Sequence, residues 1–212
     1  MDNFVVNVGR QLGSGGREIS AELAKRLNIS YYDKELLNVA SEESGLCKEF
    51  FERADEKASQ PLAGGMFGMR FPFNGSTGVN TMNYLSNDAL FQIQSDAIRK
   101  LAEEKSCLFI GRCADYILRD NPRCVNIFIS ASREFRIERI SRLDNLTAAK
   151  AEEKIDRVEK RRAEFYNYYS NKRWGAAESY HLCIDSSVLG IAQTTDFIEQ
   201  FVRAKLSLSH HS

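Results

Sequence analysis

The segment VGRQLGSGGRE, residues 8–18, has the residue types that most clearly suggest chemistry. It lies between a short apolar run and a stretch with helical periodicity. Glycines between a strand and a helix let main-chain N–H groups converge on an anion, and the helix dipole favours negative charge there. The segment therefore predicts a phosphate-binding loop. Its expected nucleotide-binding residues are Arg10, Gly13, Ser14, Gly15, Gly16 and Arg17.

The formal match to the phosphate-binding pattern G-x-x-x-x-G-K-[ST] is poor. That pattern uses a lysine on the terminal phosphates and a hydroxyl on Mg²⁺. Aligned on it, this chain has Arg10 at the first glycine, Gly16 at the lysine and Arg17 at the hydroxyl. Because arginine binds phosphate well, Arg17 or Arg10 is expected to supply the missing charge. The alternative is a plain glycine-rich turn with two solvated arginines.

Other arginines could converge on the same ligand. Phosphoryl transfer depends on positioning and on neutralising charge, so such sites gather cations. Arg112 ends an apolar run, where a solvated arginine has little reason to be, and we expect it to bind an acceptor phosphate. Arg136 and Arg162 lie in charged helical stretches, where a solvated helix face is the alternative. The further candidates are Arg139, Arg157 and Arg161.

Asp33 follows a short strand-like run, and two roles are open to it. It could bind the acceptor, or it could cap the helix predicted to begin at Lys34, because aspartate is a favoured N-cap residue. The two roles are compatible. Aromatic residues near the end of the long charged helix and after it are expected to pack between elements rather than to stack on a base. They are Phe165, Tyr166, Tyr168, Tyr169, Trp174 and Tyr180.

The elements that must position these residues alternate between strands and helices. Apolar runs predict strands at 4–8, 30–33, 107–112, 124–131 and 180–187. Helical periodicity predicts helices at 17–28, 34–44, 48–58, 87–105, 133–143, 147–171 and 191–206. This alternation indicates an α/β fold with a central parallel sheet and helices on both faces. Ligands then bind beyond the carboxyl ends of the strands, where the glycine loop lies.

Composition narrows the class of protein. The 212 residues suggest one domain, 1–212, and the Gly-, Phe- and Met-rich segment 58–82 is expected to be a flap or a disordered insertion. Lysine plus arginine balance aspartate plus glutamate at 29 each, which argues against nucleic-acid binding. The five cysteines form no C-x-x-C pair and are expected to be reduced and buried, and no spacing suggests a metal site. No run is long enough for a membrane helix, so we expect a cytoplasmic protein with no membrane partner.

Several segments together resemble the cytidylate kinase-like family of P-loop proteins. They are residues 9–37, 109–118, 127–140, 159–175 and 180–187, in that order along the chain. The resemblance implies a nucleoside-monophosphate-kinase fold, with an acceptor-binding arm at 34–105 and a helical lid at 133–175. It also implies phosphoryl transfer from ATP with Mg²⁺ to a small phosphate-bearing acceptor, with a nucleoside monophosphate such as CMP as the first candidate. Nucleotides would be its partners, and a homodimer is possible.

The resemblance carries some functional residues over and leaves others out. It implies that Arg112, Arg136 and Arg162 act in catalysis and that Asp33 and Arg112 bind the substrate. Arg17 joins the expected catalytic residues through the charge that it would supply in place of the loop lysine. The lysine and the hydroxyl of the loop are absent, an acceptor-binding arginine falls on Asn38, and an aspartate falls on Cys113. Two alternatives therefore stay open: a catalytically weak or inactive nucleotide-binding module, and a kinase of a nucleoside or another small hydroxyl metabolite.

Overall fold

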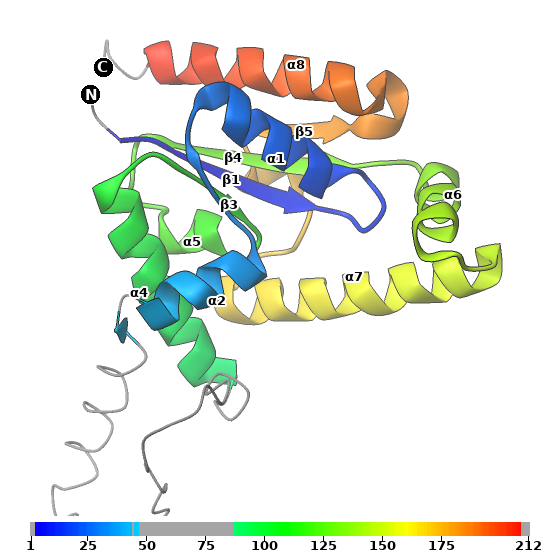
Figure 1. Cartoon of the computed structure of the whole chain (residues 1–212), viewed down its shortest axis with the longest axis horizontal. Helices are drawn as coiled ribbons and strands as arrows, with labels where there is room; N and C mark the ends of the chain where they lie inside the picture. Colours follow the sequence, from blue (N-terminus) through cyan, green and yellow to red (C-terminus); the bar gives the residue numbers. More distant parts are fainter. Residues whose placement is uncertain (1–2, 44, 47–86, 209–212) are drawn as a thin grey trace, which may run out of the picture.

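The computed structural model describes residues 3–43, 45–46 and 87–208. The described chain forms a parallel five-stranded sheet with helices around it (Figure 1). Across the sheet the strand order is β2-β3-β1-β4-β5, so the strand that leads into the glycine loop is central. The strands are β1 Val5–Arg10, β2 Ser30–Tyr32, β3 Cys107–Ile110, β4 Cys124–Ser130 and β5 Leu182–Asp185.

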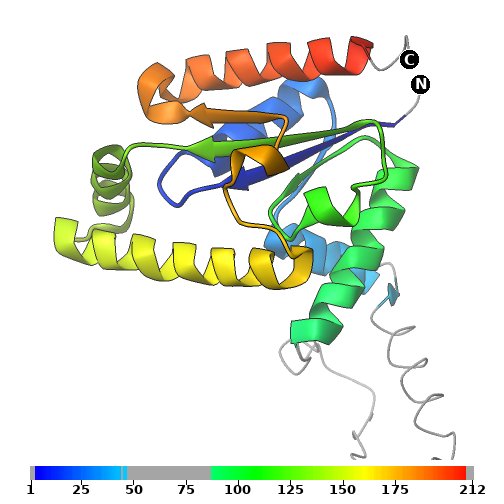
Figure 2. The same cartoon turned by 180° about the vertical axis from the view of Figure 1, so that it is seen from behind.

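The helices connect these strands and cover both faces of the sheet (Figures 1 and 2). They are α1 Gly16–Leu27, α2 Lys34–Glu43, α4 Asn87–Glu104, α5 Ala114–Ile117, α6 Arg133–Asp144, α7 Ala148–Ser170 and α8 Ser186–Leu208, with a 3₁₀ turn at Ala177–Ser179. Helices α1 and α8 lie on one face, and α4, α5 and α7 lie on the other. This arrangement confirms the predicted α/β class.

Alternation along β1 explains the two layers of core. Val6 and Val8 are buried with residues of α1 and α8, whereas Val5 is buried with residues of α4, α5 and α7. Successive side chains of a strand point to opposite faces, so a β-branched run buries apolar surface on both sides. Asn7 is a polar exception at 3% exposure, and its side chain faces the same layer as Val5.

Helix α6 lies beyond the carboxyl ends of the central strands, and the chain then turns back so that α7 runs along one face of the sheet; the two helices pack together as the α6–α7 hairpin (Figure 1). Each helix begins with a hydroxyl cap, because the Oγ of Ser132 accepts from the Phe135 N–H and that of Thr147 accepts from the Lys150 N–H. The hairpin lies within the predicted lid region, 133–175. The glycine loop and α7 are thereby brought to the same end of the sheet.

Some details differ from the sequence-based expectations. The short helix α5 was not predicted, and α8 begins at Ser186, with a break at Gly190 (φ 73°) before the stretch that was predicted. Within the predicted arm, α2 and α4 pack together, whereas segment 58–82 lies outside the described residues. Four cysteines of the described chain are free, but Cys183 is exposed rather than buried. No helix in the described ranges is both long and apolar enough to cross a bilayer.

His181 joins β4 to the segment that enters β5, and it makes a pH test possible. Its Nδ1 accepts the Asn126 N–H at 2.8 Å, which requires a neutral imidazole. Burial, followed by the charge of Lys205, lowers the pKa of His181 below its usual 6.5. The unfolded chain therefore binds a proton more readily, so the free energy of unfolding should fall as pH drops below about 6.5.

We expect His181→Gln, which can still accept the bond but does not titrate, to lose less stability than wild type between about pH 7.5 and 5.5. Urea unfolding at both pH values measures this difference. Equal losses in the two proteins would contradict the assigned protonation state.

Candidate active site

The glycine loop, residues 11–15, joins β1 to α1 in a conformation that needs glycine. Gly13 and Gly15 have φ values of 87° and 73°, which side chains rarely adopt. A Cβ on Gly13 would lie 2.9 Å from the main-chain oxygen of Arg136, and one on Gly15 would lie 2.9 Å from the side chain of Ile191. The loop is therefore packed between α6 and α8, and its shape is fixed before any ligand binds.

Hydrogen bonds within and around the loop leave a set of amides open. Gln11 N–H donates to the Ile129 carbonyl, and Leu12 N–H donates to a carboxylate oxygen of Glu159 at 3.2 Å. Within the described chain, the N–H groups of Gly13, Gly15 and Arg17 have no hydrogen-bond partner. Unpaired amides at a helix N-terminus form an anion site, as the sequence predicts for this loop.

Ser14 is used by the loop itself. Its side chain is fully buried, and its Oγ donates to the Gln11 carbonyl at 2.9 Å. Its N–H donates weakly to the same carbonyl at 3.4 Å, and its own carbonyl accepts from Ser186 Oγ at 2.6 Å. The Ser14 side chain therefore holds the loop, and its neighbours present the free amides; nucleotide binding at Ser14 stays a prediction.

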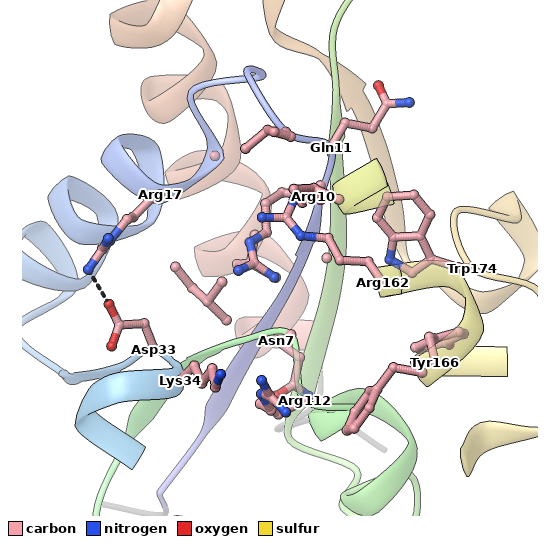
Figure 3. Close-up of a pocket in the computed structure, with 18 of the residues that line it drawn as sticks. Asn7, Arg10, Gln11, Arg17, Asp33, Lys34, Arg112, Arg162, Tyr166 and Trp174 are labelled. Carbon is pink, nitrogen blue, oxygen red and sulfur yellow. Dashed lines mark hydrogen bonds and ion pairs between the residues drawn. The ribbon is translucent and has the colours of Figure 1, made fainter. Parts of the chain in front are cut away.

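A cavity of about 1010 Å³ opens beside this loop. Its walls come from the loop, from the ends of β1 and β3, from α6 and from α7. Figure 3 shows that Arg10, Arg112 and Arg162 project into it from three different elements. The cavity lies at the carboxyl ends of the parallel strands, where the fold class predicts a ligand site.

These three arginines carry positive charge that the surrounding protein does not neutralise. Arg162 Nη1 donates to the Arg10 carbonyl at 3.0 Å, and Arg112 Nη1 lies 3.5 Å from the side-chain oxygen of Gln94. No carboxylate of the described residues forms an ion pair with any of the three. Burial, and then the charges of Arg162 and Arg112, lower the pKa of Arg10. Buried cations are costly unless paired, so the cluster favours binding of an anion.

Arg112 is held by an unusual backbone turn directly after β3. Gly111, Arg112 and Cys113 have φ values of 69°, 59° and 56°, three left-handed residues in succession. Non-glycine residues in this region cost free energy and cluster at functional sites. Gly111 N–H donates to the Val8 carbonyl, which ties the turn to β1, and the Arg112 guanidinium lies 4.9 Å from the ring centre of Phe165. The turn therefore fixes the direction of the Arg112 side chain.

Arg17 and Asp33 pair with each other at the edge of the cavity (Figure 3). The guanidinium of Arg17 is 2.6 Å from Asp33 Oδ2, and the Arg17 side chain is 73% exposed. The other oxygen, Asp33 Oδ1, accepts the Leu36 N–H at 3.1 Å. Asp33 therefore caps α2, one of the two roles open to it, and Arg17 is directed toward Asp33.

Arg136, expected to act on the ligand, lies behind the loop and does not line the cavity. Its guanidinium donates to Glu159 at 2.7 Å and to the Ala131 carbonyl at 3.0 Å, and its side chain is 7% exposed. The same oxygen of Glu159 also accepts the Leu12 N–H. Arg136 was expected to contact the ligand, but it and Glu159 instead join α6 and α7 to the loop. A different arginine of α6, one helical turn later, faces the cavity.

Arg139 is the α6 arginine that lines the cavity, and it pairs with Glu18 at 2.6 Å. Arg161 also lines it, next to Arg162 on α7. Sequence reasoning gave no role to Asp115, a cavity residue that accepts a 2.6 Å hydrogen bond from the Tyr166 hydroxyl. Burial raises the pKa of Asp115. Its only signal in the sequence was its place two residues after Cys113, where the family aspartate is missing.

The aromatic residues mainly pack elements together, as predicted. Tyr169 stacks on Phe91 of α4 with ring centres 3.9 Å apart. Trp174 and Tyr180 contact Phe128 of β4 at 5.3 and 5.0 Å. Tyr168 is exposed instead.

The donor set fits nucleotide phosphates better than a protein-bound metal. Open amides and unpaired guanidiniums are ligands for anions. The described residues contain no group of three or more His, Cys, Asp or Glu side chains that could hold a metal ion. Asp33, an oxygen donor at the cavity, is already paired with Arg17. A divalent metal would therefore be held chiefly by the phosphates themselves.

Because Glu159 bonds both the loop and Arg136, removing its carboxylate should lower the stability of the protein measurably. Glu159→Ala leaves the buried Arg136 without its carboxylate partner and frees the Leu12 N–H, so we expect the free energy of unfolding to fall by about 3 kcal/mol. Asp156→Ala is the matched control, because Asp156 pairs with Arg133 across the same two helices at an exposed position, where an ion pair adds little stability. Denaturant unfolding compares the two, and equal losses would show that the buried link does not hold the loop.

Comparison with known proteins agrees with this geometry. The family model described as "Cytidylate kinase-like family" matches residues 5–188. A search of curated proteins found no match. A solved structure of an uncharacterized protein from Eubacterium ventriosum is 25% identical, with a TM-score of 0.70 over 95% of this chain and 99% of that one.

More distant solved structures share the fold alone. A shikimate kinase from Bacteroides thetaiotaomicron is 11% identical, with a TM-score of 0.52 over 94% of this chain and 98% of that one. A gluconokinase from Sinorhizobium meliloti is 12% identical, with a TM-score of 0.50 over 99% and 95%. The family match spans most of the chain and includes the glycine loop, the turn after β3 and α7. The chain belongs to the cytidylate kinase-like family of P-loop kinase fold proteins.

Proposed function

We propose that this protein transfers a phosphoryl group from ATP to a small phosphate-bearing acceptor, with a nucleoside monophosphate such as CMP as the first candidate. The observation that carries the proposal is the cluster of Arg10, Arg112 and Arg162 beside the open loop amides, half-buried and without an ion-pair partner in the described chain. Phosphoryl transfer concentrates negative charge at one place and is catalysed by groups of this kind.

The nucleotide end of the site is the loop. The N–H groups of Gly13, Gly15 and Arg17, together with the N-terminus of α1, would hold the phosphates of ATP. Mg²⁺, when bound, would bridge the phosphates and neutralise part of their charge. Arg139 and Arg161, from the α6–α7 hairpin, would add charge from the lid side.

The acceptor end is the turn after β3. Arg112 has no ion pair in the described chain and faces the cavity, so it is the group we propose for the acceptor phosphate. Arg162 lies between Arg112 and the loop, where it could neutralise the group in transfer. Asn38, which stands where the family has an acceptor-binding arginine, accepts a 2.6 Å hydrogen bond from Gln94. Its amide cannot replace that charge.

One specific feature favours a second function, that of a nucleotide-binding module without turnover. The pattern lysine and hydroxyl are replaced by Gly16 and Arg17. A kinase of a hydroxyl metabolite is less favoured, because such a reaction benefits from a free carboxylate base, and both oxygens of Asp33 are engaged.

The proposal predicts ATP turnover that depends on Arg112. With ATP, Mg²⁺ and a panel of nucleoside monophosphates, we expect ADP release with at least one acceptor. Arg112→Gln should lower kcat/KM by about 10²-fold, because a charged ligand of the acceptor phosphate is lost. The matched control is Arg119→Gln, seven residues later at an exposed surface position beside Asp120, which should leave turnover unchanged.

Stabilisation of the protein by ATP, with no ADP formed for any acceptor, would contradict transfer to a nucleotide and support the binding module. Turnover that survives in Arg112→Gln would remove Arg112 from the acceptor site.

A further inference from the structure

The side chain of Arg10 crosses directly over Gly16. A Cβ placed on Gly16 would lie 2.7 Å from Arg10 Cβ and 3.0 Å from Arg10 Cγ, closer than real atoms approach. Farther out, a Cβ on Gly111 would lie 2.6 Å from the Arg10 Nη1. Arg10 therefore runs across the first residue of α1 and ends beside the turn that holds Arg112. A side chain at Gly16 would collide with the stem of Arg10, whereas at Gly111 it would meet only the flexible end of that side chain.

The two positions that touch are two of the three that depart from the phosphate-binding pattern, the third being Arg17. The pattern has glycine where this chain has Arg10, and lysine where it has Gly16. A long cationic side chain and a glycine have exchanged places across one contact. The exchange keeps one cationic side chain and one glycine at this contact. The cationic side chain comes from the end of β1 instead of the start of α1.

Arg17, the other candidate, is placed differently. Its guanidinium is mostly exposed and is paired with Asp33 at 2.6 Å, so its charge is already neutralised. Arg10 has no carboxylate partner among the described residues and lies beside Arg162 (Figure 3). Of the two arginines, only Arg10 has unneutralised charge within the cavity.

We propose that Arg10 replaces the phosphate-binding lysine of the loop: its guanidinium binds the terminal phosphates of a nucleotide, and Gly16 is required so that the side chain can reach them. This rests on the proposed function for the identity of the ligand. The planar guanidinium donates to two oxygens of one phosphate in a fixed fork geometry. The open amides of Gly13, Gly15 and Arg17 lie beside it and can bind a further phosphate, so the chemical class that the site selects is a polyphosphate.

The exchange can be reversed to test it. Inorganic pyrophosphate and ATP serve as probes, and the shift in melting temperature on their addition is the main readout. Arg10→Met keeps a stem over Gly16 but removes the charge. We expect it to lose the shift almost completely, while its melting temperature without ligand stays equal to wild type or rises, because an unpaired buried cation is gone. Arg17→Gln should retain more than half of the shift.

The double variant Arg10→Gly/Gly16→Lys restores the pattern and should regain at least part of the shift, whereas Gly16→Lys alone should lower the melting temperature because its stem meets Arg10. Three results would overturn the inference: a full shift in Arg10→Met, a loss confined to Arg17→Gln, or a lower ligand-free melting temperature of Arg10→Met that accounts for the lost shift.

Failure of the proposed function has a different signature. If wild type shifts with pyrophosphate and ATP but releases no ADP with any acceptor, transfer is wrong, and the variants still decide the role of Arg10. If wild type shifts with neither probe, the loop is not a polyphosphate site and the inference falls with it.

Discussion

The site depends on positive charge that the fold gathers and does not neutralise. Arg10, Arg112 and Arg162 come from the end of β1, the turn after β3 and the middle of α7, and they meet beside the amides that begin α1. Keeping such groups together opposes folding, through desolvation and mutual repulsion. The apolar cores on both faces of the sheet offset this unfavourable free energy. A bound anion would stabilise the folded protein further.

Two devices hold the cluster in place without entering it. Three left-handed residues, Gly111 to Cys113, aim Arg112, and the loop is tied to the lid hairpin through Glu159. Glu159 neutralises Arg136 and orders the Leu12 amide at the same oxygen, so one carboxylate serves both the packing of α6 on α7 and the shape of the loop. Arg136 therefore helps to position the loop, whereas the arginines proposed to bind the ligand are those that line the cavity.

Much of the fold could be predicted from the sequence, since β-branched runs and helical periodicity are local signals. The loop glycines and the position of Arg112 at the cavity also had local signals. What could not be predicted needed contacts between distant residues. Arg136 and Arg139 are equivalent by spacing, and only the approach of Glu159 separates them. Likewise, Asp33 pairs with Arg17 from 16 residues away, which leaves Arg10 as the loop arginine without an ion pair in the described chain. The short α5 that carries Asp115 has too few residues to show a period.

A crystal structure with a non-hydrolysable ATP analogue tests the central claim most directly. The account predicts phosphate oxygens within hydrogen-bond distance of the Gly15 and Arg17 amides and of the Arg10 guanidinium, with Arg17 still paired to Asp33. Phosphates bound elsewhere in the cavity, or Arg17 released from Asp33 to bind them while Arg10 makes no contact, would contradict it.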